Sequence, residues 1–201
     1  MCGGFIKPMI ADRLLYRDGL MLVLNKPAGW SCVPSGPGTH LTRHLGDLTF
    51  GKTTLPQVAH RLDRETTGCL LLGRHARALR MLADLFQAHK ITKTYWALVG
   101  GQWPADVTEI DSPIEGKDAS TRVRCLREGE GWTWLELQPQ TGRTHQLRIH
   151  CAGLGHPILG DAKYGGPPGP LKLHAQRLEV PLYPKKAAVV VDAPCPENWL
   201  T

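Results

Sequence analysis

Two segments of this sequence place a carboxylate and several cations where they could do chemistry. Residues 60–68 read HRLDRETTG, in which Asp63 stands between arginines and is followed by hydroxyl side chains and a glycine. Residues 141–150 read TGRTHQLRIH, which combines two arginines with two histidines. A carboxylate can serve as a nucleophile or as a general base, and arginine is well suited to hold one in place. Each segment taken alone is also typical of a solvated turn or helix end.

Read together with the segments around them, these motifs resemble the RluA family of pseudouridine synthases. Between them, residues 93–101 read KTYWALVGG, and after them residues 155–165 read GHPILGDAKYG. The shorter segments NKPAG at residues 25–29 and LHA at residues 173–175 also fit. The likeness runs in order from about residue 12 to residue 192, which makes chance agreement an insufficient explanation.

This resemblance implies an RNA-modifying isomerase. The C1′–N1 bond of a uridine breaks, the uracil rotates, and a C1′–C5 bond forms. Because no group is lost and nothing is oxidised, the resemblance implies neither a cofactor nor a metal ion. The target base must leave its stack to be reached, at a cost of a few kcal/mol.

The resemblance also assigns roles to residues. Asp63 is the catalytic carboxylate, and attack on the sugar, attack on the base and proton removal from the sugar all remain open for it. Arg148 pairs with this carboxylate. Tyr95 lies against the uracil and takes part in removing the C5 proton, Leu147 packs against its ring, and Arg61 fills the space that the flipped base leaves. Further substrate-contacting or RNA-contacting positions are His60, Thr67, Arg143 and His145. Thr67 stands where the family usually has serine.

The elements that must position these motifs follow from the apolar pattern. Residues 75–89 have apolar side chains at helical spacing, and a second helix is predicted from a Thr144 cap to Ala152. Residues 30–59, rich in small and turn-forming residues, are predicted to form a long loop. Strands are predicted at residues 20–24, 69–72, 94–99, 121–127, 132–138, 171–180 and 187–191.

This pattern predicts an α+β fold because strands outnumber helices and several neighbours look antiparallel. The resemblance specifies the pseudouridine synthase fold, a central mixed and mostly antiparallel sheet flanked by helices. We expect residues 1–201 to form a single catalytic domain, with its core at about 12–192 and no accessory N-terminal RNA-binding domain.

Two other functions compete with this reading. Residues 46–53 read GDLTFGKT and match the P-loop of NTPases. A P-loop requires a strand before it and a helix after it, whereas residues 40–45 make a poor strand and Pro56 follows closely, so we expect this match to be fortuitous. The other alternative is an inactive RNA-binding module on the same scaffold, against which the presence of Asp63 argues.

Charge and composition fit a protein that binds RNA. The chain has 24 Lys and Arg against 18 Asp and Glu, a net charge of +6. The basic excess is largest in residues 60–96 and 141–186, and the acidic stretch 97–140 separates these two blocks. We therefore expect the basic segments to face structured RNA, an rRNA or tRNA hairpin, and the acidic stretch to point away.

The remaining expectations concern the location of the protein in the cell, its metal content and its partners. No apolar run approaches the roughly 18 residues of a membrane span, and the start lacks the features of a secretory signal. The cysteines do not have the spacing of a zinc site. We expect a cytoplasmic monomer with no membrane association and no protein partner.

Overall fold

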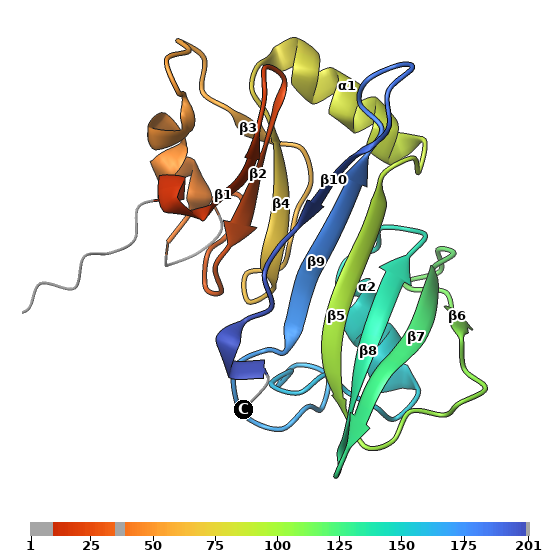
Figure 1. Ribbon diagram of the computed structural model, residues 1–201. Coiled ribbons are helices and arrows are strands. Elements are labelled where there is room, and N and C mark those ends of the chain that lie inside the picture. Colours follow the sequence, from red (N-terminus) through yellow and green to blue (C-terminus); the bar gives the residue numbers. More distant parts are fainter. Residues whose placement is uncertain (1–9, 35–38, 200–201) are drawn as a thin grey trace, which may run out of the picture.

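One large sheet organises the chain, and the computed structural model describes residues 10–34 and 39–199 of it (Figure 1). Within these residues, the strand order is β1-β2-β4-β9-β5-β8-β7-β6, with β3 beside β4 and β10 beside β9. The strands are β1 (Leu14–Arg17), β2 (Met21–Lys26), β3 (Gln57–Val58), β4 (Thr67–Gly73), β5 (Thr92–Gly100), β6 (Glu109–Asp111), β7 (Ser120–Gly129), β8 (Trp132–Pro139), β9 (Leu173–Val180) and β10 (Val189–Asp192). Among them β4 and β9 pair in parallel, and the other pairs are antiparallel. The predicted α+β class with a mixed, mostly antiparallel sheet is confirmed.

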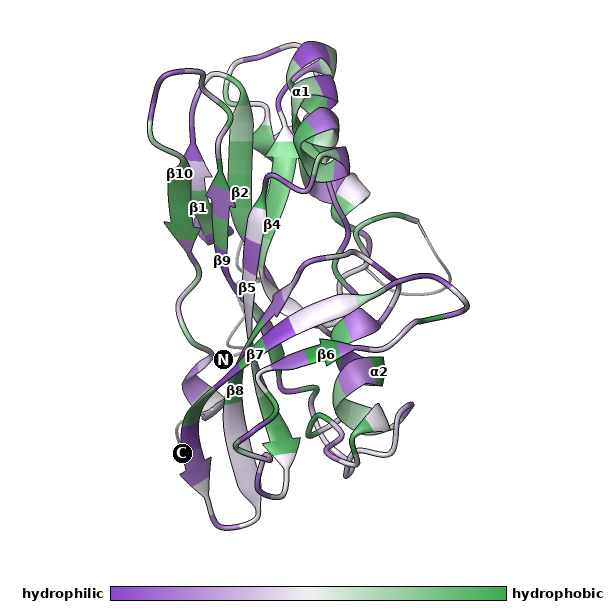
Figure 2. Cartoon of the chain, turned by 90° about the vertical axis from the view of Figure 1, so that its right-hand side faces the viewer, coloured by the Kyte–Doolittle hydropathy of each residue, from purple (hydrophilic) through white to green (hydrophobic). Residues whose placement is uncertain are grey.

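Two α-helices lie on the same side of this sheet (Figure 2). Helix α1 (Ala76–Gln87) confirms the helix predicted at residues 75–89, and the His75 side chain caps it by accepting a hydrogen bond from the backbone N–H of Ala78. Helix α2 (Gln146–Gly153) starts later than predicted. Its N-cap is His145 in the left-handed conformation, so the predicted Thr144 cap is wrong. No helix in the described ranges is long and apolar enough to cross a membrane.

The apolar side chains form two separate cores along the sheet. The first lies among β1, β2, β4, α1 and the 3₁₀ helix η2 (Leu41–Leu48), and it includes Leu82 of α1. The second lies among β5, β7, β8 and α2, and it includes Leu147. Tyr95 of β5 packs against both cores. The junction between the cores is therefore the natural place for groups from both halves to meet.

The predicted long loop at residues 30–59 contains regular structure. Helix η2 spans Leu41–Leu48 and buries three leucines in the first core, and β3 follows it. In the P-loop-like segment, a helix precedes Lys52 and the short strand β3 comes next, which is the reverse of the strand-loop-helix order that a P-loop needs. Lys52 is exposed. The geometry therefore contradicts the NTPase alternative.

The short parallel contact between β4 and β9 fixes the centre of the sheet. Thr67 pairs with His174 and Gly68 with Ala175, while Tyr95 of β5 pairs with Ala175 from the other side. Gly68 has a φ of 103°, and a Cβ at this position would collide with the backbone carbonyl of Ala175. Only glycine allows both this conformation and this close approach.

We predict that Gly68→Ala lowers the free energy of unfolding by about 3 kcal/mol, because it adds both backbone strain and a clash with main-chain atoms. Urea denaturation measures this effect. Gly153→Ala is the matched control, since Gly153 lies outside the left-handed region and a Cβ there meets open space. Equal unfolding midpoints for the two variants would contradict the prediction.

Candidate active site

Asp63 lies in the loop that joins β3 to β4, and two buried groups, one at the end of β2 and one in the segment after it, fix this loop. The ammonium group of Lys26 donates hydrogen bonds to three backbone carbonyls, those of Pro27, Trp30 and Arg64, at 3.0, 3.0 and 2.9 Å. Burial lowers the pKa of Lys26 to about 8. The Cys32 sulfur lies 3.4 Å from both the backbone nitrogen and the carbonyl oxygen of Leu62. The backbone on both sides of Asp63 is therefore held in place.

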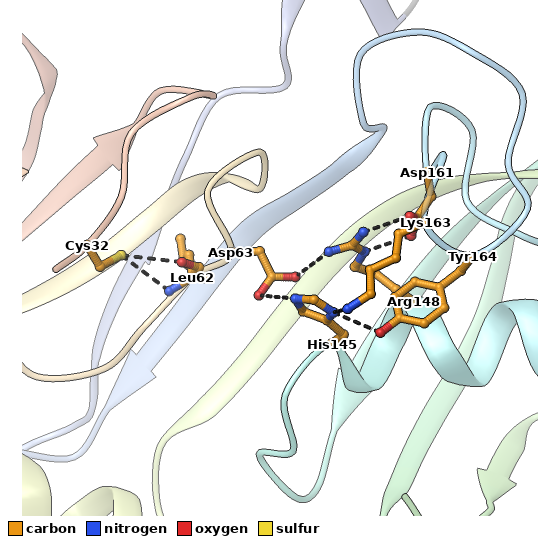
Figure 3. Close-up of polar contacts among 8 residues, drawn as sticks. All are labelled: Cys32, Leu62, Asp63, His145, Arg148, Asp161, Lys163 and Tyr164. Carbon is orange, nitrogen blue, oxygen red and sulfur yellow. Dashed lines mark hydrogen bonds and ion pairs between the residues drawn. The ribbon is translucent and has the colours of Figure 1, made fainter. Parts of the chain in front are cut away.

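Arg148 of α2 joins this loop to the second half of the molecule (Figure 3). Its Nη1 donates to Asp63 Oδ2 at 3.2 Å, and its Nε and Nη2 donate to the two oxygens of Asp161, both at 2.7 Å. The side chain of Asp161 is completely buried. The hydrogen bonds to Asp161 raise the pKa of Arg148 above its usual value. The predicted pairing of Arg148 with Asp63 is thus present, and Asp161 orients the guanidinium.

His145 approaches the same carboxylate from another direction. Its Nε2 lies 3.7 Å from Asp63 Oδ1, and its Nδ1 lies 2.8 Å from the Tyr164 hydroxyl. The Lys163 ammonium is 3.4 Å from Nδ1. Burial lowers the pKa of His145, Asp63 opposes this shift, and the positive charges of Arg148 and Lys163 add to it. His145 is therefore mostly neutral at neutral pH.

Tyr95 completes the centre of the site from the sheet. Burial raises the pKa of its phenol, and the negative charge of Asp63 raises it further. The phenol therefore stays protonated over the whole physiological range. Leu147 is buried in the second core, against which Tyr95 packs. The structure thus brings together Asp63, Tyr95, Leu147 and Arg148, which come from a loop, a strand and a helix.

Two other predicted residues face the protein interior. The Nε2 of His60 accepts a hydrogen bond from the backbone N–H of Leu71 at 3.0 Å, and its ring packs on Phe86. Burial lowers the pKa of His60 to about 3, which keeps the ring neutral. The Thr67 hydroxyl lies 2.7 Å from His174 Nδ1, between β4 and β9. These contacts give both residues a role in holding the sheet and loop together.

Two predicted arginines are exposed beside the site. Arg61 has no hydrogen-bond or ion-pair partner for its guanidinium in the described part of the chain. Arg143 donates from Nε to the carbonyl of Asp118 at 2.9 Å. The acidic stretch 97–140 thus contacts the segment before α2 through the backbone carbonyl of Asp118, and the expectation that this stretch points away from RNA stays a prediction. The turn at residues 129–131 of this stretch lies at the end of β5, where the backbone N–H of Gly101 donates a hydrogen bond to the carbonyl of Gly131.

The sequence reasoning assigned no role to Asp161, Lys163 or Tyr164. All three follow α2 in the segment that reads GDAKYG, which belongs to one of the motifs that carry the resemblance. An aspartate within a glycine-rich turn is a usable signal, but its burial and its distance to Arg148 become visible only in three dimensions. Across residues 10–34 and 39–199, no group of three or more His, Cys, Asp or Glu side chains could hold a metal ion.

Comparison with known proteins identifies similar chains over most of this length. Residues 20–153 match the family described as RNA pseudouridylate synthase. An uncharacterized RNA pseudouridine synthase of Zymomonas mobilis is 35% identical, over 96% of this chain and 97% of that protein. The ribosomal large subunit pseudouridine synthase C of Vibrio cholerae is also 35% identical, over 76% of this chain but 52% of that protein.

Solved structures agree with this match. Human RNA pseudouridylate synthase domain containing 4 superposes with a TM-score of 0.80 at 25% identity, covering 95% of this chain and 91% of that one. Human RNA pseudouridylate synthase domain containing 1 gives a TM-score of 0.77 at 28% identity, with coverage of 91% and 83%.

We predict that Asp161→Ala lowers the free energy of unfolding by about 3–5 kcal/mol, because it leaves the Arg148 guanidinium without its buried partner. Chemical denaturation measures the loss. The control is Asp192→Ala, which breaks a pair of similar geometry, 2.6 Å from Arg177 Nε, whose two side chains are 42% and 46% exposed. That control should cost less than about 1 kcal/mol, and similar costs for the two variants would refute the role of burial.

Proposed function

This chain belongs to the family of RNA pseudouridine synthases, and we propose that it converts uridine in ribosomal RNA to pseudouridine with Asp63 as its catalytic carboxylate. The observation that carries the assignment of Asp63 is its position. It projects from a fixed loop toward the Arg148 guanidinium at 3.2 Å, at the junction of the two cores where Tyr95 also lies. The enzyme class is an isomerase, and RNA is its substrate.

The charges around Asp63 suit this reaction. The bond between N1 of the base and C1′ of the sugar must break, and a bond between C5 and C1′ must form. This reaction needs a carboxylate held next to the sugar or the base. Arg148 orients this carboxylate but does not fully neutralise its negative charge. The reason is that two of the three guanidinium nitrogens that form hydrogen bonds donate to Asp161. The protonated phenol of Tyr95 presents an aromatic face to a flipped uracil and adds no negative charge beside Asp63. The reaction changes neither composition nor oxidation state, so it calls for no cofactor.

Arg61 is placed to support base flipping. It precedes Asp63 by two residues on the same loop and its side chain is exposed. A planar guanidinium can stack on neighbouring bases and occupy the gap that an extruded nucleotide leaves. With Arg143, it gives the rim of the site two exposed cations for the RNA backbone.

The relatives favour ribosomal RNA over tRNA as the substrate. Synthases of Vibrio cholerae and Buchnera aphidicola that are named for the ribosomal large subunit are 35% and 33% identical to this chain, which spans about half of their length. We take residues 12–192 to act as one catalytic domain, in the cytoplasm and as a monomer. The monomer is supported by a site whose Asp63, Tyr95 and Arg148 come from one chain.

We predict that Asp63→Asn lowers the rate of pseudouridine formation by at least about 100-fold and leaves RNA affinity nearly unchanged, because phosphate contacts supply most of that affinity. The assay incubates purified enzyme with rRNA and tRNA from cells that lack this gene, and then maps pseudouridine. Asp84→Asn, on the exposed surface of α1, is the control and should retain full activity.

The outcomes of this assay separate the candidate functions. RNA binding by the wild-type chain without any pseudouridine would favour an inactive binding module. Modification confined to tRNA would overturn the ribosomal assignment, and full activity of Asp63→Asn would overturn the role of Asp63.

A further inference from the structure

His145 has an unusual backbone and side-chain arrangement for a residue that begins a helix. Its φ is 56°, in the left-handed region that costs a non-glycine residue about 1 kcal/mol or more. Its side chain makes no capping hydrogen bond to α2. The ring is instead turned toward Asp63 and Tyr164 (Figure 3). The left-handed backbone is therefore associated with aiming the imidazole into the site.

The neighbours of the ring determine which of its nitrogens carries the hydrogen. The Lys163 ammonium, 3.4 Å from Nδ1, can only donate, and the Tyr164 hydroxyl at 2.8 Å is free to donate as well. Nδ1 is thus the acceptor in the neutral ring, and the hydrogen resides on Nε2. Nε2 faces Asp63 Oδ1 at 3.7 Å. A neutral N–H dipole therefore points at the oxygen of Asp63 that Arg148 does not bind.

The charges packed around the ring oppose one another. Asp63 approaches from the β3–β4 loop, Arg148 from α2, and Asp161 and Lys163 from the segment after α2. The two carboxylates favour the imidazolium, and the two cations together with burial disfavour it. The net effect is a pKa below the ordinary value for histidine, so protonation takes place on the acid side of neutrality.

We propose that His145 is the second positioning residue of Asp63, neutral in the working enzyme and inhibitory when protonated. In the neutral state, Arg148 binds Oδ2 by a hydrogen bond at 3.2 Å, and the Nε2–H dipole of His145 faces Oδ1 at 3.7 Å, longer than a hydrogen bond, and favours this orientation of the carboxylate by electrostatic attraction. When the ring gains a proton, a second full positive charge faces Asp63 at ion-pair distance and weakens it as a nucleophile or base. This inference rests on the proposed function, because its readout is pseudouridine formation.

Other groups near Asp63 do not titrate in the same range. The pKa of Tyr95 is raised, that of Lys26 is about 8, and those of His60 and His174 are lowered to about 3 and about 4. An acid limb that lies between the ranges of these groups and disappears in His145→Gln therefore reports on His145.

The test measures the single-turnover rate of pseudouridine formation from pH 5 to 8 with saturating enzyme, which removes the effect of RNA affinity. One pH unit below its midpoint, the wild-type rate falls to about a tenth of its plateau, as for one titrating group. His145→Gln keeps an N–H donor that does not titrate, so at that pH it retains more than half of its own plateau. Lys163→Met removes a cation that suppresses protonation, and it moves the acid limb to higher pH.

A double variant, His145→Gln with Lys163→Met, checks that both effects act through the imidazole. It should have the acid limb of His145→Gln alone. An unchanged midpoint in His145→Gln, with the rate lowered equally at every pH, would show a merely structural role and overturn the inference. If His145→Gln does not fold, Lys163→Met decides, since Lys163 is exposed and an unmoved limb there overturns it equally. Absence of pseudouridine with the wild-type enzyme would instead mark a failure of the proposed function.

Discussion

The guanidinium of Arg148 is shared between a fully buried carboxylate and a partly exposed one. Asp161 takes two of its nitrogens at 2.7 Å, and Asp63 takes a third at 3.2 Å. Breaking a buried ion pair is strongly destabilising, so the fold keeps the Arg148 guanidinium paired with Asp161. Asp63 must therefore be brought to the arginine. The buried Lys26, with its three carbonyl contacts, and the Cys32 thiol achieve this by holding the loop backbone.

Tyr95 and Arg148 keep a fixed protonation state beside Asp63, which leaves this carboxylate as the anion available to a substrate. Tyr95 stays a phenol because burial and the nearby carboxylate both raise its pKa, and Arg148 stays charged because its carboxylate partners stabilise the cation. An isomerisation that rearranges two bonds at one base requires no exchange of groups with solvent. The role that we propose for Asp63 requires a carboxylate whose direction is fixed while the base turns, and the hydrogen bond to Arg148, which Asp161 holds in turn, fixes this direction.

The amino-acid pattern predicted the regular part of this fold well, and its exceptions have physical causes. The apolar runs of β2 and β4 and the alternation in β8 identify buried strands directly. Strand β1 has no comparable signal, because its four residues are mostly half-buried. Helix α2 begins at a left-handed histidine, a conformation that tertiary contacts impose and local propensity disfavours. The closeness of Asp63 and Arg148, 85 residues apart, came from the family resemblance, and the role of Asp161 came only from its burial.

The two separate cores have a consequence for how the enzyme tolerates stress. Asp63 belongs to a loop anchored in the first core, through Leu62, and Arg148 belongs to a helix anchored in the second, through Leu147 and Cys151. Neither half contains a working site alone. In the proposed active site, loosening of either half would separate the Asp63 carboxylate from the Arg148 guanidinium. With Asp63 in the role that we propose, activity is therefore expected to disappear before the chain unfolds completely.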